Sequence, residues 1–201
     1  MSSSGSAAKP TLVVSALAFE LAGLISEDLK GIHPVVTGMG QQKAKSGLER
    51  ALKEIRPRRI IAVGLCGGLA PGEVIGSLAV PSSIVAQGKE AGIICETLPG
   101  LDHRGVLVTV PGPVTTPAAK ADLRKATMAD WVDMESYAWA EVARERGIPF
   151  AVMRVVVDSW DEFLPNLGSP RSWSSALSLP QRSFQARRKL HQEARRVLCE
   201  L

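Results

Sequence analysis

Apolar runs with the character of β-strands alternate along the chain with segments in which apolar residues recur at helical spacing. The most pronounced run covers residues 151–158 and holds no Gly or Pro, which is typical of a strand buried on both faces of a parallel sheet. This alternation predicts an α/β protein. Strands are expected at 11–15, 33–37, 59–63, 106–110 and 151–158, with short ones near 80, around 87–96 and at 131–133, and helices at 16–30, 41–55, 118–127, 136–147 and 181–201.

Two glycine-rich turns are expected directly after predicted strands. Gly38-Met39-Gly40 precedes the helix 41–55, and a denser turn covers residues 64–72. Glycine lets backbone N–H groups come close to an anion or another polar ligand. Lys43 stands where a dinucleotide-binding fingerprint has its third glycine, so NAD binding is not favoured. A tight structural turn explains the first motif equally well. Further loops are expected at 111–117 and 168–180.

The length of 201 residues fits one domain with a sizeable core. Residues 1–10 form a Ser/Gly/Ala-rich leader that is expected to be disordered, and residues 11–201 are expected to form the domain. The apolar run 12–25 imitates a signal peptide, but Glu20 lies in its middle and no small-residue cleavage site follows. It is also too short to cross a bilayer as a helix. We therefore expect a cytoplasmic protein.

The formal net charge of +4 reflects basic residues gathered in the last twenty positions, so it does not indicate a nucleic-acid partner. The segment 181–201 combines an apolar stripe with a basic remainder. The favoured interpretation is a terminal helix packed on the body with a solvated basic face. The alternative is contact with the anionic inner face of a membrane. The stripe consists of Ala186, Leu190, Ala194, Val197 and Leu201.

Cysteine and histidine positions do not predict a metal site or a cofactor. Cys66, Cys95 and Cys199 are odd in number and widely spaced, which favours a reducing cytosol over a disulfide framework. No two of them have the spacing of metal ligands. His103 lies in a polar turn, where we expect a solvated side chain.

Three carboxylates stand at the ends of predicted strands or the starts of predicted helices. Asp158 ends the strand 151–158, Glu135 precedes the helix 136–147, and Glu20 lies near the start of the helix 16–30. In open α/β sheets ligands bind just beyond the carboxyl ends of strands, so these side chains are candidates for one shared cleft. Turn, cap and helix-dipole roles explain each of them equally well.

Several fragments together resemble the nucleoside phosphorylase/nucleosidase superfamily, over roughly residues 12–161. The most specific are Val132-Asp133-Met134-Glu135-Ser136 and Arg154-Val155-Val156-Val157-Asp158, supported by Gly67-Gly68-Leu69. The chain looks most like methylthioadenosine/S-adenosylhomocysteine nucleosidases and short hopanoid-associated nucleosidases. The resemblance implies a three-layer α/β/α sandwich with a mixed, largely parallel sheet, a small-molecule nucleoside substrate and a homodimer.

The same resemblance implies a role for each matching residue. Asp158 would protonate the leaving base, and Glu20 would activate the attacking water. Glu135 would grip the ribose hydroxyls above Met134, and Arg154 would help to hold the nucleophile. Burial near other acids would raise the pKa of Asp158 in the required direction. The further candidates are Gly67, Gly68, Val114, Trp160 and Phe163 for the base or substrate pocket, and Gly38, Gly40, Lys43, Gly64 and Leu65 for a phosphate or nucleophile loop.

The sequence is therefore compatible with three functions. The first is a hydrolase of an adenine nucleoside whose 5′ substituent is an apolar thioether or lipid, because Trp160 and Phe163 follow Asp158 directly. The second is a phosphorylase, which is disfavoured because Leu65 stands where the family often has a hydroxyl residue and no cation lies between residues 11 and 29. The third is a non-catalytic nucleoside-binding protein, which would not need Glu20.

Overall fold

The computed structural model describes residues 9–25, 29–89, 91–164 and 173–201, so the expected leader 1–10 lies outside the described part except for its last two positions. The strands are β1 (Thr11–Ser15), β2 (Ile32–Val36), β3 (Arg59–Gly68), β4 (Leu78–Ala79), β5 (Ser83–Ala86), β6 (Ile93–Ile94), β7 (Val106–Thr109), β8 (Trp131–Asp133) and β9 (Phe150–Asp158). The helices are α1 (Ala18–Leu21), α2 (Gln41–Glu54), α3 (Pro117–Thr127), α4 (Ser136–Glu145) and α5 (Trp173–Cys199).

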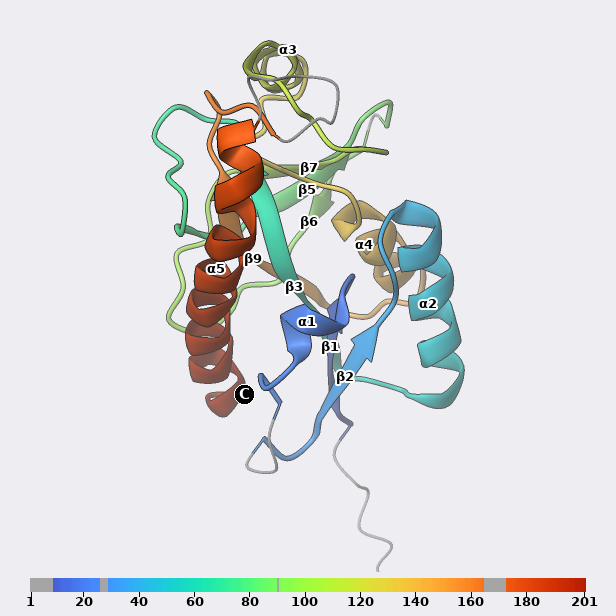
Figure 1. Ribbon diagram of the computed structural model, residues 1–201. Coiled ribbons are helices and arrows are strands. Elements are labelled where there is room, and N and C mark those ends of the chain that lie inside the picture. The colour runs from blue at the N-terminus through green and yellow to red at the C-terminus, as the bar shows by residue number, and fades with distance from the viewer. Residues whose placement is uncertain (1–8, 26–28, 90, 165–172) are drawn as a thin grey trace, which may run out of the picture.

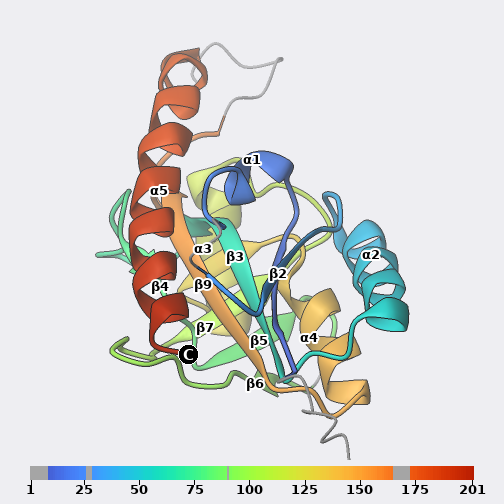
Figure 2. The ribbon, with the colours of Figure 1, turned by 90° about the horizontal axis from the view of Figure 1, so that it is seen from below.

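A mixed sheet lies between two helical layers (Figures 1 and 2). Its strand order is β2-β1-β3-β8-β7-β5-β6, and β9 pairs with both β3 and β4 off this path. Five strand pairs of the described chain are parallel and three are antiparallel. α2 and α4 lie on one face and α5 on the other. The predicted three-layer fold with a largely parallel sheet is confirmed.

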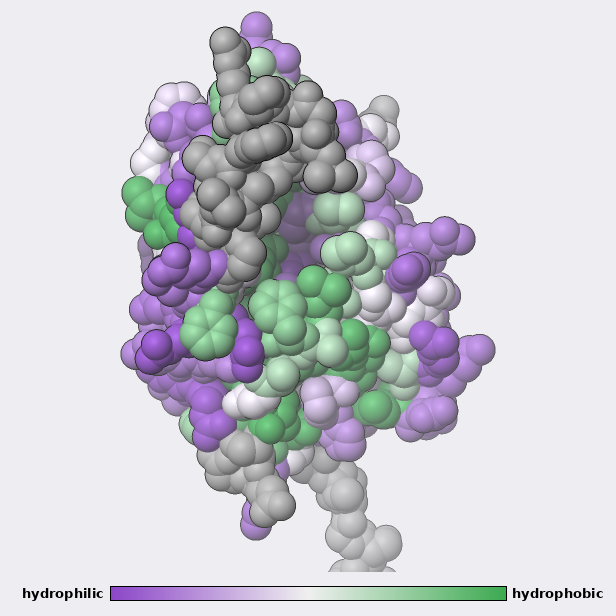
Figure 3. Space-filling view, viewed as in Figure 1, coloured by the Kyte–Doolittle hydropathy of each residue, from purple (hydrophilic) through white to green (hydrophobic). Residues whose placement is uncertain are grey.

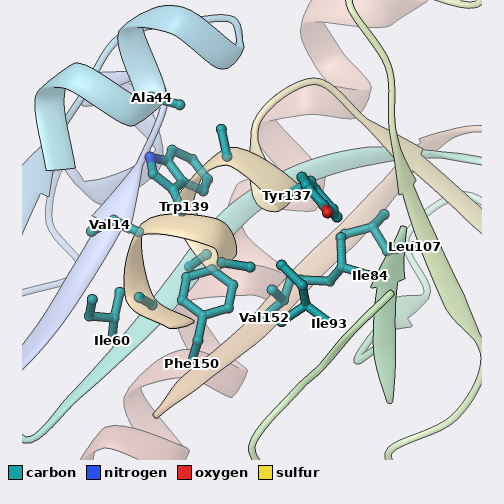
Figure 4. Close-up of a cluster of buried hydrophobic side chains, with 14 of the residues drawn as sticks. Val14, Ala44, Ile60, Ile84, Ile93, Leu107, Tyr137, Trp139, Phe150 and Val152 are labelled. Carbon is teal, nitrogen blue, oxygen red and sulfur yellow. The ribbon is translucent and has the colours of Figure 1, made fainter. Parts of the chain in front are cut away.

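Alternate residues of the central strands feed two separate cores. Leu12 and Val14 of β1 belong to the cluster under α2 and α4, whereas Val13 belongs to the cluster under α5. Because successive strand side chains point to opposite faces, a strand that is apolar at every position must be covered on both. Trp139 of α4 fills the space between this helix, α2 and the sheet (Figure 4).

The terminal helix packs as its stripe predicts. Ala186, Leu190, Ala194 and Val197 are buried in the cluster shared with β3 and β9, which confirms the favoured interpretation of this segment. The helix is longer than expected, since it begins at Trp173. The loop expected at 168–180 is therefore wrong from residue 173 onward, and residues 168–172 lie outside the described part. No described helix is long and apolar enough to cross a bilayer.

Two further segments differ from the sequence-based expectation. The helix expected at 16–30 is a single turn, α1, and the chain leaves it through Gly23 at φ +80°. The turn expected at 64–72 begins late, because β3 continues through Gly64 to Gly68 beside β9. The sequence predicts a turn there, since glycine composition alone does not distinguish a turn from a strand that other groups approach closely.

Candidate active site

The three candidate carboxylates line one pocket of about 210 Å³ at the carboxyl ends of the central strands. Glu20 comes from α1, Glu135 precedes α4, and Asp158 ends β9. The expected convergence of these side chains is therefore confirmed. The remaining lining residues are Ala16, Leu17, Met39, Leu65, Cys66, Gly67, Val110, Gly112, Pro113, Val114, Val132, Asp133, Met134, Val157 and Leu164.

Glu20 is held in the pocket by backbone donors. Its Oε2 accepts from the Leu17 N–H at 2.9 Å, and its Oε1 accepts from the Leu65 N–H at 3.2 Å. The side chain is 4% exposed, and this burial raises the pKa of Glu20, while the charge of Arg154 opposes the rise. A carboxylate with a raised pKa, fixed at the edge of a cavity, is suited to take a proton from a nucleophile.

Gly64 separates Glu20 from Arg154. A Cβ at this position would overlap Arg154 Nη1 and lie 2.7 Å from Glu20 Oε1. Both groups approach the strand so closely that only glycine fits. Gly64 therefore contacts the buried side chains of Glu20 and Arg154. It is not among the residues that line the pocket.

Arg154 lies below the pocket and is 1% exposed. Its Nη2 donates to Asp133 Oδ2 at 2.7 Å and to Ser136 Oγ at 2.8 Å. Its guanidinium carbon stands 5.3 Å from the centre of the Trp139 ring. This buried cation offsets the charge of the carboxylates above it, so it stabilises several acids in one small volume.

Asp133 is a pocket residue for which the sequence analysis assigned no role. Besides Arg154, it accepts from Thr109 Oγ1 at 2.7 Å and from the Ser136 N–H at 3.1 Å. These bonds fix the start of α4. The signal available in the sequence was its place two residues before Glu135 at a strand end.

Glu135 is joined to the first glycine motif. Its Oε1 accepts from the Gly40 N–H at 2.8 Å, and Gly40 has φ +85°. The backbone donor of this turn therefore faces a carboxylate of the protein. Burial raises the pKa of Glu135, opposed by Arg154. Met39 and Met134, which directly precede Gly40 and Glu135 in the sequence, both line the pocket.

Asp158 lies against β3 and α3. A Cβ on Gly67 would lie 3.0 Å from Asp158 Oδ2, so a larger residue at this position would crowd the carboxyl group. The fully buried Lys120 of α3 donates to the same oxygen. Burial raises the pKa of Asp158, while the Lys120 ion pair opposes the rise. The pKa of Asp158 is therefore raised by burial, as expected. The nearest charge, however, is the cation of Lys120, where the sequence analysis expected acids.

Lys120 is the residue that sequence reasoning missed. A usable signal existed, because Lys120 and Leu123 are spaced three apart and are the buried positions of α3. A lysine on the inward stripe of a short amphipathic helix needs a buried partner.

The other sequence candidates divide into two groups. Gly67, Leu65 and Val114 line the pocket. Trp160 and Phe163 do not, and they are 40% and 38% exposed. The remaining residues outside the lining are Gly38, Gly40, Lys43, Gly64, Gly68 and Arg154. Figure 3 shows apolar side chains gathered on the face that α1 occupies.

The charged side chains that line the pocket all have one sign. Four carboxylates line it, those of Glu20, Asp133, Glu135 and Asp158, and among its described lining residues there is no Arg, Lys, Ser or Thr. An inorganic phosphate anion would meet repulsion there and no side-chain donor of the usual kinds. A neutral molecule that offers hydroxyl groups would instead find acceptors.

The basic face of α5 is partly turned toward α1. Arg187 Nη2 donates to the Ala22 carbonyl, His191 Nε2 lies 2.7 Å from the Glu20 carbonyl oxygen, and Arg195 Nη1 donates to the Leu24 carbonyl at 3.2 Å. These contacts hold the end of the helical turn that carries Glu20. Part of the basic face of α5 therefore binds the protein's own backbone.

A solvated side chain was expected for His103, but this residue is half-buried and hydrogen-bonded. Its Nε2 accepts from the Leu98 N–H at 2.6 Å, in a loop outside the pocket. Its role there is to hold the local backbone. Among the described residues no group of His, Cys, Asp and Glu has an arrangement that could hold a metal ion.

Comparison with known proteins is consistent with this geometry. The model of the phosphorylase superfamily matches residues 27–99 and 101–174. The 5′-methylthioadenosine/S-adenosylhomocysteine nucleosidase of Neisseria meningitidis, in complex with methylthio-immucillin-A, has a TM-score of 0.80 and 17% identity over 96% of this chain and 100% of that one. No curated protein sequence matches the chain.

Two other solved structures have the same fold. The 5′-methylthioadenosine nucleosidase of Arabidopsis thaliana has a TM-score of 0.76 and 21% identity, with 96% of each chain covered. The futalosine hydrolase of Helicobacter pylori strain 26695 has a TM-score of 0.77 and 15% identity, over 96% of this chain and 98% of that one. At these identities the likeness shows the fold.

Proposed function

The chain belongs to the phosphorylase superfamily, and on this premise we propose that it is a nucleosidase, which hydrolyses the N-glycosidic bond of an adenine nucleoside. The observation that carries the choice of water over phosphate is the charge of the pocket. Four carboxylates line it, and no Arg, Lys, Ser or Thr is among its described lining residues. Structural similarity to nucleosidases named for methylthioadenosine supports the adenine base.

The proposed mechanism divides the work among the three predicted carboxylates. Asp158 protonates the leaving base, so that the electron pair of the broken bond ends on a neutral molecule. Glu20 takes a proton from the water that adds to C1′. Glu135 accepts hydrogen bonds from the ribose hydroxyls, which are charge-assisted and fix the sugar. Arg154 keeps Glu20 and Asp133 in place from below.

The test of this proposal is release of free base from adenine nucleosides, measured with and without inorganic phosphate. We expect the rate to be nearly unchanged by phosphate and the sugar product to be the free ribose derivative. The physical reason is repulsion between a phosphate anion and the pocket carboxylates. Strict dependence on phosphate, with a sugar 1-phosphate as product, would instead establish a phosphorylase.

We propose further that the 5′ substituent of the substrate is apolar. Apart from its carboxylates the pocket is lined mainly by apolar residues, among them Leu17, Met39 and Leu164. The sequence predicts Trp160 and Phe163 at this end of the substrate. Both side chains are partly exposed, and in the chain they shortly precede Leu164, which lines the pocket. Pockets of this composition favour a thioether or an alkyl chain over a bare hydroxyl or a phosphate.

The preference is tested with adenosine, methylthioadenosine and a long-chain 5′-alkyl adenosine at equal concentration. We expect kcat/KM to rise in this order, because each methylene removed from water contributes about 0.8 kcal/mol when it is fully buried. Equal or faster turnover of adenosine would contradict an apolar 5′ substituent and leave the nucleosidase proposal untouched.

A further inference from the structure

A buried ammonium group lies directly beside the proposed general acid. Lys120 has no exposed surface, and its Nζ donates to Asp158 Oδ2 and, at 2.6 Å, to the Ser159 carbonyl oxygen. Thr116 caps the helix by accepting from the Ala119 N–H at 3.2 Å, which fixes the turn of α3 that carries Lys120. The pair is therefore built from two rigid elements, α3 and the end of β9.

This ion pair opposes the proposed role of Asp158 as a general acid. A general acid must hold a proton when the bond breaks. The neighbouring ammonium group favours the ionised carboxyl group, and so opposes the protonated form of Asp158 that burial favours. Either the pair is only structural, or the proton on Lys120 is the one that the reaction uses.

We propose that Lys120 supplies, through Asp158, the proton that leaves with the base; the inference rests on the nucleosidase function proposed above. A proton passes from Lys120 Nζ to Asp158 Oδ2, giving a neutral amine and a neutral carboxyl group. Asp158 passes a proton to the base as the electron pair of the C1′–N bond moves onto it. Water adds to C1′ and gives its proton to Glu20. Once the products have left, Glu20 releases its proton to solvent and Lys120 regains one.

The charges around Asp158 allow this exchange. Besides Lys120, Glu162 and Arg182 act on it, and these two are paired with each other at 2.8 Å. Cys66 of β3 lies within its electrostatic reach, and Asp161 interacts with Lys120. Burial raises the pKa of Asp158 against the ion pair. Without the ammonium group, Asp158 therefore holds its own proton up to a higher pH than an ordinary aspartate.

Two substitutions separate a proton source from a structural pair. Lys120→Met removes the cation and leaves Asp158 as the proton source. We expect near-normal turnover at low pH and an alkaline limb of the kcat profile displaced to lower pH, with about a tenfold fall per pH unit beyond it. Lys120→Arg keeps a cation that does not release its proton. We expect this variant to lose about 10²-fold in kcat across the neutral range.

The controls make each outcome decisive. Lys125→Met changes an exposed lysine of the same helix and should leave the profile unchanged. Wild-type base release tests the proposed function separately, since its absence rejects that function and not the pairing. Wild-type turnover by Lys120→Arg would overturn the inference, as would a uniform loss in Lys120→Met with no shift of the limb. If Lys120→Met does not fold, as monitored by its thermal transition, the arginine variant alone decides.

Discussion

Asp158→Asn is expected to lower kcat by about 10²-fold or more, the usual contribution of a general acid. The amide keeps the size and polarity of the side chain but has no acidic proton to give to the leaving base. Its amide oxygen can still accept from Lys120, but the ammonium group loses its anionic partner. Steady-state kinetics with an adenine nucleoside checks this, with KM expected to change less than kcat because ground-state binding depends on other groups.

Two comparisons sharpen that experiment. Asp102→Asn alters an exposed aspartate that does not line the pocket and should leave turnover unchanged. Glu135→Gln should raise KM as well as lower kcat, since an anionic acceptor for two hydroxyl groups is lost. Near-normal turnover by Asp158→Asn would show that another group protonates the base, and the role proposed for Lys120 would fall with it.

Glu20→Gln should also lower kcat by about 10² to 10⁴-fold, because an amide cannot accept a proton from water. In the wild-type protein the base must be ionised. Burial raises the pKa of Glu20, so activity should fall with decreasing pH through a value above the ordinary range of a glutamate. In the variant that acid limb should disappear. The measurement is kcat/KM as a function of pH, compared with Glu54→Gln, which changes an exposed residue of α2.

Folding must be checked in the same variant. Glu20 accepts from two partly buried backbone N–H groups, those of Leu17 and Leu65, and a glutamine has one acceptor oxygen to offer. Leaving one donor unsatisfied costs about 1–3 kcal/mol of stability. A lower Tm with a retained acid limb and substantial turnover would contradict the role of Glu20 as the base and leave it only a structural one.

The apolar pattern determined most of the fold on its own. The run 151–158 predicted a strand covered on both faces, and β9 lies between two cores as a result. The spacing of Ala186, Leu190, Ala194 and Val197 predicted the buried stripe of α5. Such patterns are reliable because burial acts on every residue of an element, so the signal accumulates along it.

Three carboxylates of the pocket were also readable from the sequence. Glu20, Glu135 and Asp158 each follow a predicted strand, and the carboxyl ends of neighbouring parallel strands meet at one edge of a sheet. This rule accounts for Glu20 and Asp158, because β1 and β9 both run parallel to β3. Glu135 follows β8, which runs antiparallel to β3, so its place in the same pocket was not given by the rule. The partner of each charge was a different matter, because a partner is chosen by contacts across the fold.

Only the tertiary structure decided which charges stand together and how closely. Lys120 and Asp158 are 38 residues apart and meet because the fold brings the first turn of α3 to the end of β9. Gly64 and Gly67 were predicted to form a turn, yet they are strand residues whose missing side chains make room for Glu20, Arg154 and Asp158. No local pattern encodes these contacts, since each depends on atoms that distant segments bring to the same place. The carboxylates could therefore be found in the sequence, but the source of the proton could be inferred only from the packing around Asp158.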